Sequence, residues 1–466
     1  MDDLIRKRFS GKSVAILGFG REGQSTYSLI RRVLPDLPLT IVDANENVVA
    51  NPLVARDNNL QFITGDGYES HLPEFDLIVR SPGITIWQLT GLPGQPVADG
   101  QISHGKITSQ TELFLEKYSA QVIGITGTKG KSTTSSLIHH ILRCAGRDVL
   151  LAGNIGNPVF HITGLITPET LIVVELSSHQ LEFLKVAPHI SVFLNLFQEH
   201  LDAYPSYEAY QHAKLNITRY QSESDFIVFN ADDNLVSALI NPFLPFRKGF
   251  SYSLSVKQEK GTSLRDGQIV FCDGLKEVPV WKIHQDRFLR GEHNLKNIMA
   301  AINVAMILGI DPEFIEEGIA TFKGLEHRLE YVGEYKKIHF YNDSIATIPE
   351  ACIEAIRAIP SVDTLVAGGF DRGIDYAGLG SFLAGSDVRN IILIGAAGYR
   401  IGKEIQLVSL GKKQLFFINR FDDFAPIAFR ETRPGNVCLL SPAAASYDEF
   451  QNFEERGKRF RELIQR

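Results

Sequence analysis

The sequence predicts an α/β protein with three domains, and three observations support this prediction. The chain has 466 residues, which corresponds to about three domains of ~150 residues each. Glycine-rich turns at residues 18–23 and 127–130 each follow a short apolar strand and precede a helix. From residue 338 onward, apolar strands again alternate with helices. We therefore expect a Rossmann-like domain over residues 1–103, a central P-loop domain with a mainly parallel sheet over residues 104–324, and a C-terminal Rossmann-like α/β domain over residues 325–466.

The N-terminal domain carries a glycine pattern that is typical of dinucleotide binding. Short apolar strands are expected at residues 14–17, 39–42 and 77–79. A full Gly-x-Gly-x-x-Gly follows the first strand, and an aspartate ends the second. Taken alone, this pattern predicts an NAD site, and its residues are Gly18, Gly20, Arg21, Glu22, Gly23 and Asp43. A polar stretch with glycine and proline from Thr90 to Lys106 predicts a domain boundary near residue 103.

The second glycine-rich turn predicts a triphosphate site. Its glycines permit backbone N–H groups to converge on anionic oxygens, and the following helix directs its positive end to the same point. A lysine adds a full charge, and the hydroxyls that follow can bind magnesium. The loop is a P-loop variant, because Ile125 stands where the first glycine of that motif would fall. An ordinary glycine turn is the structural alternative. The loop residues are Gly127, Thr128, Lys129, Gly130, Lys131, Ser132 and Thr133.

Polar residues follow the next two apolar strands of the central domain. Glu175 ends the strand at residues 171–175, where a carboxylate can bind Mg²⁺ directly or through water. His200 follows the strand at residues 190–196, and Lys214 lies on a helix that begins near Ser206. The structural alternatives are a surface glutamate, a hydrogen-bonded core histidine and a lysine in a surface salt bridge. Because both strands should end at one sheet edge, we favour a functional cluster.

A helix and a third set of strands complete the chain. Apolar residues recur at helical spacing over residues 291–308, with Asn294 and Asn297 in the first turn and Gly309 at the end. A loop at residues 323–328 follows this helix. The strands of the third domain are expected at residues 338–341, 364–367, 391–394 and 437–440.

Composition excludes several classes of protein. The net charge of −7 is spread over mixed-sign segments, which argues against a nucleic-acid partner. The four cysteines lie far apart, which argues against a zinc site or a disulfide framework. No apolar run approaches the ~20 residues of a membrane span, and the N-terminus lacks the apolar core of a signal peptide. We expect a cytoplasmic protein and a monomer.

Short motifs occur in a fixed order along the chain, at residues 127–133, 153–156, 175–178, 199–202, 213–214, 293–297, 327–330, 342–344 and 441–443. This ordered set resembles the Mur ligases of peptidoglycan synthesis over all three domains. The resemblance implies ATP-dependent addition of D-glutamate to UDP-N-acetylmuramoyl-L-alanine. It also implies an acyl phosphate intermediate, two Mg²⁺ ions and small-molecule partners only.

The resemblance assigns a role to each matching residue. It replaces NAD by the UDP-sugar, and the residues implied for it are Gly18, Gly20, Arg21, Glu22, Gly23, Asp43, Ser81, Pro82, Gly83 and Asn154. For ATP it implies the loop at residues 127–133 with Asn294, Asn297, Arg328 and Asp343. The implied metal-binding residues are Ser132, Glu175, His200 and Lys214, the last as a carbamate, and the implied catalytic residues are Lys131, His200 and Lys214. For the incoming glutamate it implies Thr347, Arg372 and Ser441.

The sequence also departs from the pattern of this family. Ile345 stands where many glutamate-adding members have a lysine, and Arg372 stands near the position of another lysine that binds the amino-acid carboxylate. Arginine can bind that carboxylate bidentately. These departures, with Ile107-Thr108-Ser109, leave L-glutamate as an alternative acceptor. A folylpolyglutamate synthetase would not need the N-terminal glycine motif, and a non-catalytic nucleotide switch would not need Lys214 or a third domain.

Overall fold

The computed structural model describes residues 1–84, 102–154, 157–199, 203–284, 288–289 and 291–465. The chain forms two units, residues 1–322 and 323–466. In the described part of the chain, the first unit contains two sheets and the second unit contains one. The predicted α/β class is confirmed. The domain boundaries near residues 103 and 324 stay a prediction.

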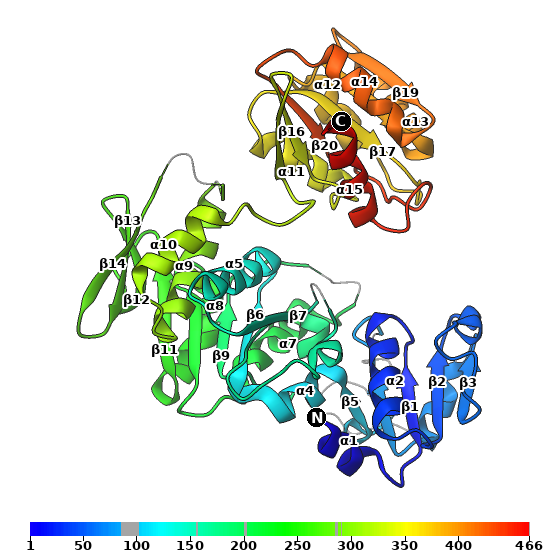
Figure 1. The fold of residues 1–466 in the computed structure, drawn as a ribbon, viewed down its shortest axis with the longest axis vertical. Helices are drawn as coiled ribbons and strands as arrows, with labels where there is room; N and C mark the ends of the chain where they lie inside the picture. Colours follow the sequence, from blue (N-terminus) through cyan, green and yellow to red (C-terminus); the bar gives the residue numbers. More distant parts are fainter. Residues whose placement is uncertain (85–101, 155–156, 200–202, 285–287, 290, 466) are drawn as a thin grey trace. The chain divides into compact units, whose positions relative to one another are not determined.

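The first sheet has the strand order β3-β2-β1-β4-β5, and its described pairings are all parallel. Strands β1, β2, β3 and β5 are labelled in Figure 1. Its strands are β1 (Val14–Leu17), β2 (Leu39–Asp43), β3 (Leu60–Thr64), β4 (Leu77–Arg80) and β5 (Ile107–Ser109). The accompanying helices are α1 (Asp2–Phe9), α2 (Arg21–Val33) and α4 (Gln110–Tyr118). Strand β5 comes after residues 85–101 and pairs with β4. The glycine turn after β1 therefore lies at the carboxyl edge of a parallel sheet.

The central sheet has the order β14-β13-β12-β11-β10-β9-β6-β8-β7. Its parallel part comprises β6 (Val122–Thr126), β7 (Val149–Gly153), β8 (Leu171–Glu175), β9 (Ile190–Phe193), β10 (Phe226–Asn230), β11 (Lys248–Ser253) and β12 (Lys260–Arg265). Strands β13 (Gln268–Asp273) and β14 (Glu277–Lys282) extend it in antiparallel pairing. The ends of β6, β8 and β9 lie at one edge of the sheet, which is where nucleotide sites form in such folds.

Helices cover both faces of the central sheet. One face carries α5 (Lys131–Cys144), α9 (Glu292–Ile307) and α10 (Pro312–Thr321), which pack on one another (Figure 1). The other described helices of this part are α6 (Ser178–Leu181), α7 (Tyr207–Arg219) and α8 (Asn234–Ile240). Along β8, Val173 packs in the core with α5, whereas Ile172 and Val174 pack in a core shared with the first sheet. Burial on both faces explains the continuous apolar run of this strand.

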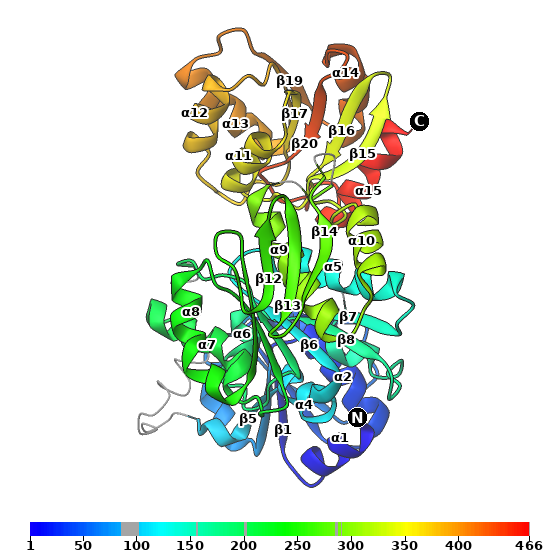
Figure 2. The ribbon, with the colours of Figure 1, turned by 90° about the vertical axis from the view of Figure 1, so that its left-hand side faces the viewer.

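The second unit contains a single sheet between two layers of helices (Figure 2). Its order is β15-β16-β20-β17-β18-β19, and only the pairing of β15 with β16 is antiparallel among the described strands. The strands are β15 (Glu330–Tyr335), β16 (Ile338–Asn342), β17 (Val362–Gly368), β18 (Asn390–Ile394), β19 (Gln414–Ile418) and β20 (Val437–Leu440). One layer contains α11 (Pro349–Ala358), α12 (Ala377–Gly385) and α13 (Gly395–Val408), and the other contains α14 (Phe424–Glu431) and α15 (Phe453–Ile464).

Short 3-10 helices lie at Glu46–Ala50, Tyr68–Glu74, His104–Lys106, Ser119–Gln121, Val159–Ile162, Asn241–Phe246 and Phe421–Asp423. Within the described ranges, the helices are too short or too polar to cross a bilayer.

The packing between α9 and the central sheet predicts a measurable stability effect. Ile302 is fully buried on α9. Ile302→Ala should lower the free energy of unfolding by about 2–5 kcal/mol, because it removes buried methyl groups and leaves a cavity. Urea denaturation followed by circular dichroism measures this loss. The control Leu275→Ala alters a side chain that is 93% exposed and should change stability by less than ~0.5 kcal/mol. Equal stabilities of the two variants would contradict the packing described here.

Candidate functional site

The glycine loop after β6 has a backbone that only glycine tolerates at two positions. Gly127 and Gly130 have φ values of +155° and +85°. A Cβ at Gly130 would lie 2.5 Å from Oδ1 of Asn297, which therefore packs directly on the loop. Asn195 supports the other side, since its backbone and side-chain oxygens accept hydrogen bonds from the backbone N–H groups of Thr128 and Lys129 at 3.0 and 2.8 Å. The loop leads directly into α5, whose first N–H groups have no partner within the helix.

Two lysines converge on this loop. Nζ of Lys131 donates to the carbonyl oxygens of Gly127 and Thr128, each at 3.0 Å, and Nζ of Lys214 donates to the Gly127 carbonyl at 2.9 Å. Only 2% of Lys214 is exposed. Burial holds the pKa of Lys214 well below its ordinary value, and the charge of Lys131 lowers the pKa further. Burial and the neighbouring cation thus both favour the neutral form of Lys214 beside the glycine loop.

Glu175 presents an oxygen without a partner at the same sheet edge. Its side chain is 1% exposed, and its Oε1 accepts a hydrogen bond from Nδ2 of Asn154 at 2.8 Å. Its Oε2 is buried and makes no hydrogen bond within the described residues. Since an anionic oxygen buried in this way is costly, the position suits a cation. The structure places Asn154, predicted to bind the UDP-sugar, against this carboxylate.

The remaining central residues lie around the loop. Ser132 is half-buried in the first turn of α5, and Thr133 is buried behind it. Lys129 is exposed and forms an ion pair with Glu199. The prediction for His200 lies outside the described residues. Within the described ranges, no cluster of three His, Cys, Asp or Glu side chains is placed to bind a metal. Ser132, Glu175 and Lys214 are therefore the described members of the predicted metal set.

Asn294 and Asn297 lie together on the first turns of α9. Nδ2 of Asn297 donates to Oδ1 of Asn294 at 3.1 Å. Because Asn297 also contacts Gly130, both amides lie close to the phosphate loop. Their contact to a bound nucleotide stays a prediction.

The N-terminal motif forms a compact turn. Gly18 has a φ of +87°, and a Cβ at Gly23 would lie 2.1 Å from the Gly18 carbonyl oxygen. The carboxylate of Asp43 accepts a hydrogen bond from the backbone N–H of Phe19 at 2.7 Å. Oγ of Ser81 donates to the Gly18 carbonyl at 2.8 Å, so the turns after β1 and β4 are joined. Around this turn lie the exposed Gly20, Arg21 and Gly83 and the half-buried Pro82.

Glu22 occupies an unexpected environment. Its carboxylate is directed at the central domain, where Oε1 accepts a hydrogen bond from Nε2 of Gln180 at 2.7 Å. Burial raises its pKa. Sequence reasoning also missed Arg80 and Glu182, which form a buried ion pair close by. An arginine at the end of an apolar strand was the available signal, but its partner is distant in the sequence.

The predicted residues of the second unit follow neighbouring strands. Asp343, after β16, accepts hydrogen bonds from Oγ of Ser441 at 2.8 Å and from the backbone N–H of Leu329 at 3.1 Å. Burial raises the pKa of Asp343 to about 7. Arg372, after β17, is exposed and donates to the Thr347 carbonyl at 2.9 Å. Asp343 therefore contacts Ser441, and Arg372 contacts Thr347. The side chains of Arg328 and Ile345 are exposed to solvent.

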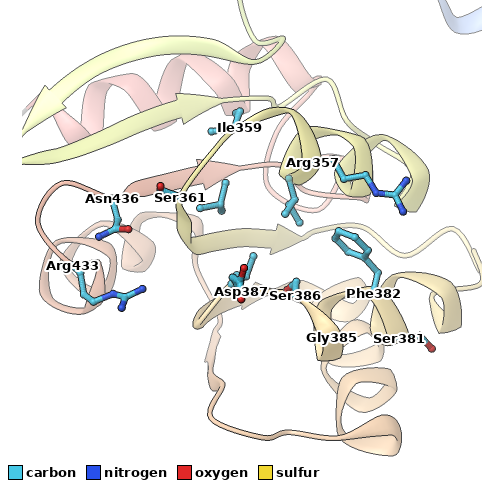
Figure 3. A pocket seen from close by; sticks show the side chains of 13 residues that line it. Arg357, Ile359, Ser361, Ser381, Phe382, Gly385, Ser386, Asp387, Arg433 and Asn436 are labelled. Carbon is cyan, nitrogen blue, oxygen red and sulfur yellow. The ribbon is translucent and has the colours of Figure 1, made fainter. Parts of the chain in front are cut away.

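This unit also contains a cavity of about 710 Å³, which lies away from the predicted site residues (Figure 3). Its lining includes Arg357, Phe382, Arg433 and Asn436, and it lies at the start of β17, β18 and β20. None of the predicted site residues lines it. The predicted residues instead follow the carboxyl ends of these strands, which is where ligands bind in parallel sheets.

The buried carboxyl of Asp343 predicts a dependence of stability on pH. Its pKa rises from 3.8 to about 7 on folding, so the folded state retains a proton that the unfolded chain releases. This contribution to stability is fully present below pH 3.8 and is lost as the pH rises towards 7. Asp343→Asn should therefore lose less stability than the wild type across this range, as measured by urea denaturation of the ligand-free protein. Glu334→Gln, an exposed change in the same unit, is the control. Parallel curves for Asp343→Asn and wild type would contradict the prediction.

Comparisons with known proteins identify the family. A family model for the Mur ligase middle domain matches residues 125–305. The UDP-N-acetylmuramoylalanine–D-glutamate ligase of Acetivibrio thermocellus is 34% identical, with 99% of this chain and 97% of the relative covered. The ligase of the same name from Caldanaerobacter subterraneus is 35% identical, with 97% and 98% covered. The MurF ligase of Thermotoga maritima, solved in complex with ADP, shares the fold with a TM-score of 0.54 at 16% identity, with 100% of this chain and 99% of that chain covered. The chain therefore belongs to the Mur ligase family.

Proposed function

We propose that the protein joins D-glutamate to UDP-N-acetylmuramoyl-L-alanine and converts ATP to ADP and phosphate in doing so, a step of peptidoglycan precursor synthesis. The names of the relatives over the full length of the chain support this reaction. The observation that carries it is the convergence of Lys131, Lys214 and Glu175 at the phosphate loop. Since ATP and the UDP-linked sugar are both found inside the cell, we expect the reaction to take place in the cytoplasm.

The chemistry explains why such a loop is needed. Amide formation in water requires the alanyl carboxylate to carry a leaving group, and transfer of the γ-phosphoryl group of ATP supplies one. One carboxylate oxygen bonds to the γ-phosphorus and ADP leaves. The glutamate amine then attacks the acyl carbon, the nitrogen releases a proton, and the bond to phosphate breaks. The first step brings two anions together, so positive charge must be concentrated there. Lys131 and the N-terminal end of α5 provide such charge.

The chain's own groups fit a divalent cation at this place. Ser132 offers a hydroxyl, and the unpartnered Oε2 of Glu175 offers a buried anionic oxygen. When bound, Mg²⁺ supplies positive charge that shields the phosphate oxygens from the incoming carboxylate. His200 is the proposed ligand of a second ion. The lowered pKa of Lys214 favours the neutral amine that carbamate formation with CO₂ requires, and the carbamate would place an anion at the same position.

The remaining substrate contacts follow the positions of the predicted residues. Asn294 and Asn297 lie at the phosphate loop and suit the adenosine part of ATP, while Arg328 and Asp343 stay predicted ATP contacts. The turn formed by Gly18, Gly23, Asp43 and Ser81 suits a diphosphate next to a helix N-terminus. For glutamate, Arg372 offers a guanidinium beside Thr347, which suits a carboxylate.

The reaction predicts a strict dependence of phosphate release on both substrates. With ATP and Mg²⁺, phosphate should appear only when UDP-N-acetylmuramoyl-L-alanine and D-glutamate are both present. Mass spectrometry of the product should show one added glutamyl residue. Turnover with L-glutamate alone would establish the alternative acceptor, and the absence of product with either enantiomer would refute the proposed ligation.

Lys214 predicts a distinctive rescue. Lys214→Ala should lower turnover by about 10- to 100-fold, because the anion that supports the metal site is lost. Acetate or propionate should restore part of the activity, since a short carboxylate fits the space of the missing carbamate. Lys131→Ala is the matched control: it removes a cation from the same loop and should not respond to these acids. Full activity of Lys214→Ala without added acid would contradict the role of the carbamate.

A further inference from the structure

The short helix α6 is held from two directions by the N-terminal domain. It starts three residues after Glu175, the carboxylate at the sheet edge. Arg80, the last residue of β4, and Glu182, which follows α6, form an ion pair with Nη1 and Oε2 2.8 Å apart. Their side chains are 3% and 2% exposed. A pair so completely removed from water fixes its partners more strictly than a surface pair does.

The guanidinium of Arg80 makes two further hydrogen bonds that define its geometry. Nη2 donates to the carbonyl oxygen of His179 in α6 at 2.6 Å, and Nη1 donates to that of Ile84 at 2.8 Å. Ser81, the next residue, donates to the Gly18 carbonyl in the glycine turn. One planar side chain therefore ties the loop after β4 to the backbone of α6.

A second connection runs from the glycine motif to the same helix. Oε1 of Glu22 accepts from Nε2 of Gln180 at 2.7 Å, and Oε1 of Gln180 accepts from the backbone N–H of Ser177 at 3.0 Å. Ser177 lies two residues after Glu175 and caps α6. Hydrogen-bonded side chains thus lead from the start of α2 to the segment that carries the metal-site carboxylate.

We propose that Arg80 and Glu182 are positioning residues. They set the distance between the glycine turn at residues 18–23, which would hold the UDP diphosphate, and Glu175 at the end of β8. This inference rests on the proposed function. A substrate held at its UDP end by one domain must present its alanyl carboxylate to the γ-phosphate at the other. A displacement of about 1 Å between reacting groups can cost about 100-fold in rate. The ion pair therefore acts on turnover and leaves the binding of each nucleotide unchanged.

The alternative is that the Arg80–Glu182 pair only stabilises the fold. Single and double replacements of the pair distinguish this role from positioning. Replacing one partner leaves an uncompensated buried charge, which destabilises the fold. Replacing both by apolar residues of similar size is often neutral for stability. The double variant Arg80→Met/Glu182→Leu removes the ion pair and the hydrogen bonds to His179 and Ile84 while it retains packing. Arg80→Lys keeps the charge but cannot reproduce the planar fork.

The matched control is another ion pair of the same domain. Arg31 on α2 pairs with Asp57, with side chains 14% and 11% exposed, and its further hydrogen bonds go to the carbonyl oxygens of Leu37 and Asn59 in the same domain. Arg31→Met disturbs the N-terminal domain without altering α6. For each variant, the experiment measures the melting temperature, the dissociation constants of UDP and ATP by calorimetry, and kcat at saturating substrates.

We expect the double variant to bind UDP and ATP as the wild type does, while its kcat falls about 10- to 100-fold. Arg80→Lys should lose less, and Arg31→Met should keep its kcat. If the double variant melts below the assay temperature, the kcat of Arg80→Lys alone is used to test the inference. An unchanged kcat in the deciding variant would overturn the inference, as would a loss of kcat in Arg31→Met of the same size. A wild-type protein without turnover would instead refute the proposed function.

Discussion

The candidate site depends on excluding water from a carboxylate and an amine at one edge of the central sheet. Glu175 and Lys214 are almost completely buried, and one oxygen of Glu175 makes no hydrogen bond within the described residues. Such burial penalises charge on either group unless an ion of opposite sign is bound. In the unliganded protein, burial lowers the pKa of Lys214, whose Nζ donates to the Gly127 carbonyl, and Oε2 of Glu175 is left for a cation to bind.

The same constraint links the phosphate loop to catalysis. Lys131 donates to the carbonyl oxygens of Gly127 and Thr128, so it must release them to reach a phosphate. Asn195 and Asn297 contact the loop from two sides. In the proposed reaction, nucleotide binding would replace these internal hydrogen bonds of Lys131 by an ion pair with a phosphate.

Much of the fold could be predicted because its strands are locally encoded. The apolar runs at residues 14–17, 171–175 and 437–440 form strands at those positions. Strands such as β14, which mixes charged and apolar residues around a proline, carry no such run. The contact of Glu22 with Gln180 could not be predicted, because the two residues are 158 positions apart and no local sequence pattern indicates their pairing. The contacts between Asp343 and Ser441 and between Arg80 and Glu182 are distant in the same way.

Oxygen transfer tests the central claim most directly, since the account holds that the groups gathered at this sheet edge promote attack of the substrate carboxylate on ATP. UDP-N-acetylmuramoyl-L-alanine with ¹⁸O in its alanyl carboxylate is incubated with the protein, ATP, Mg²⁺ and D-glutamate, and the released phosphate is analysed by mass spectrometry. The account predicts one ¹⁸O atom in each phosphate released from fully labelled substrate. Phosphate without the label, formed together with the amide product, would contradict it.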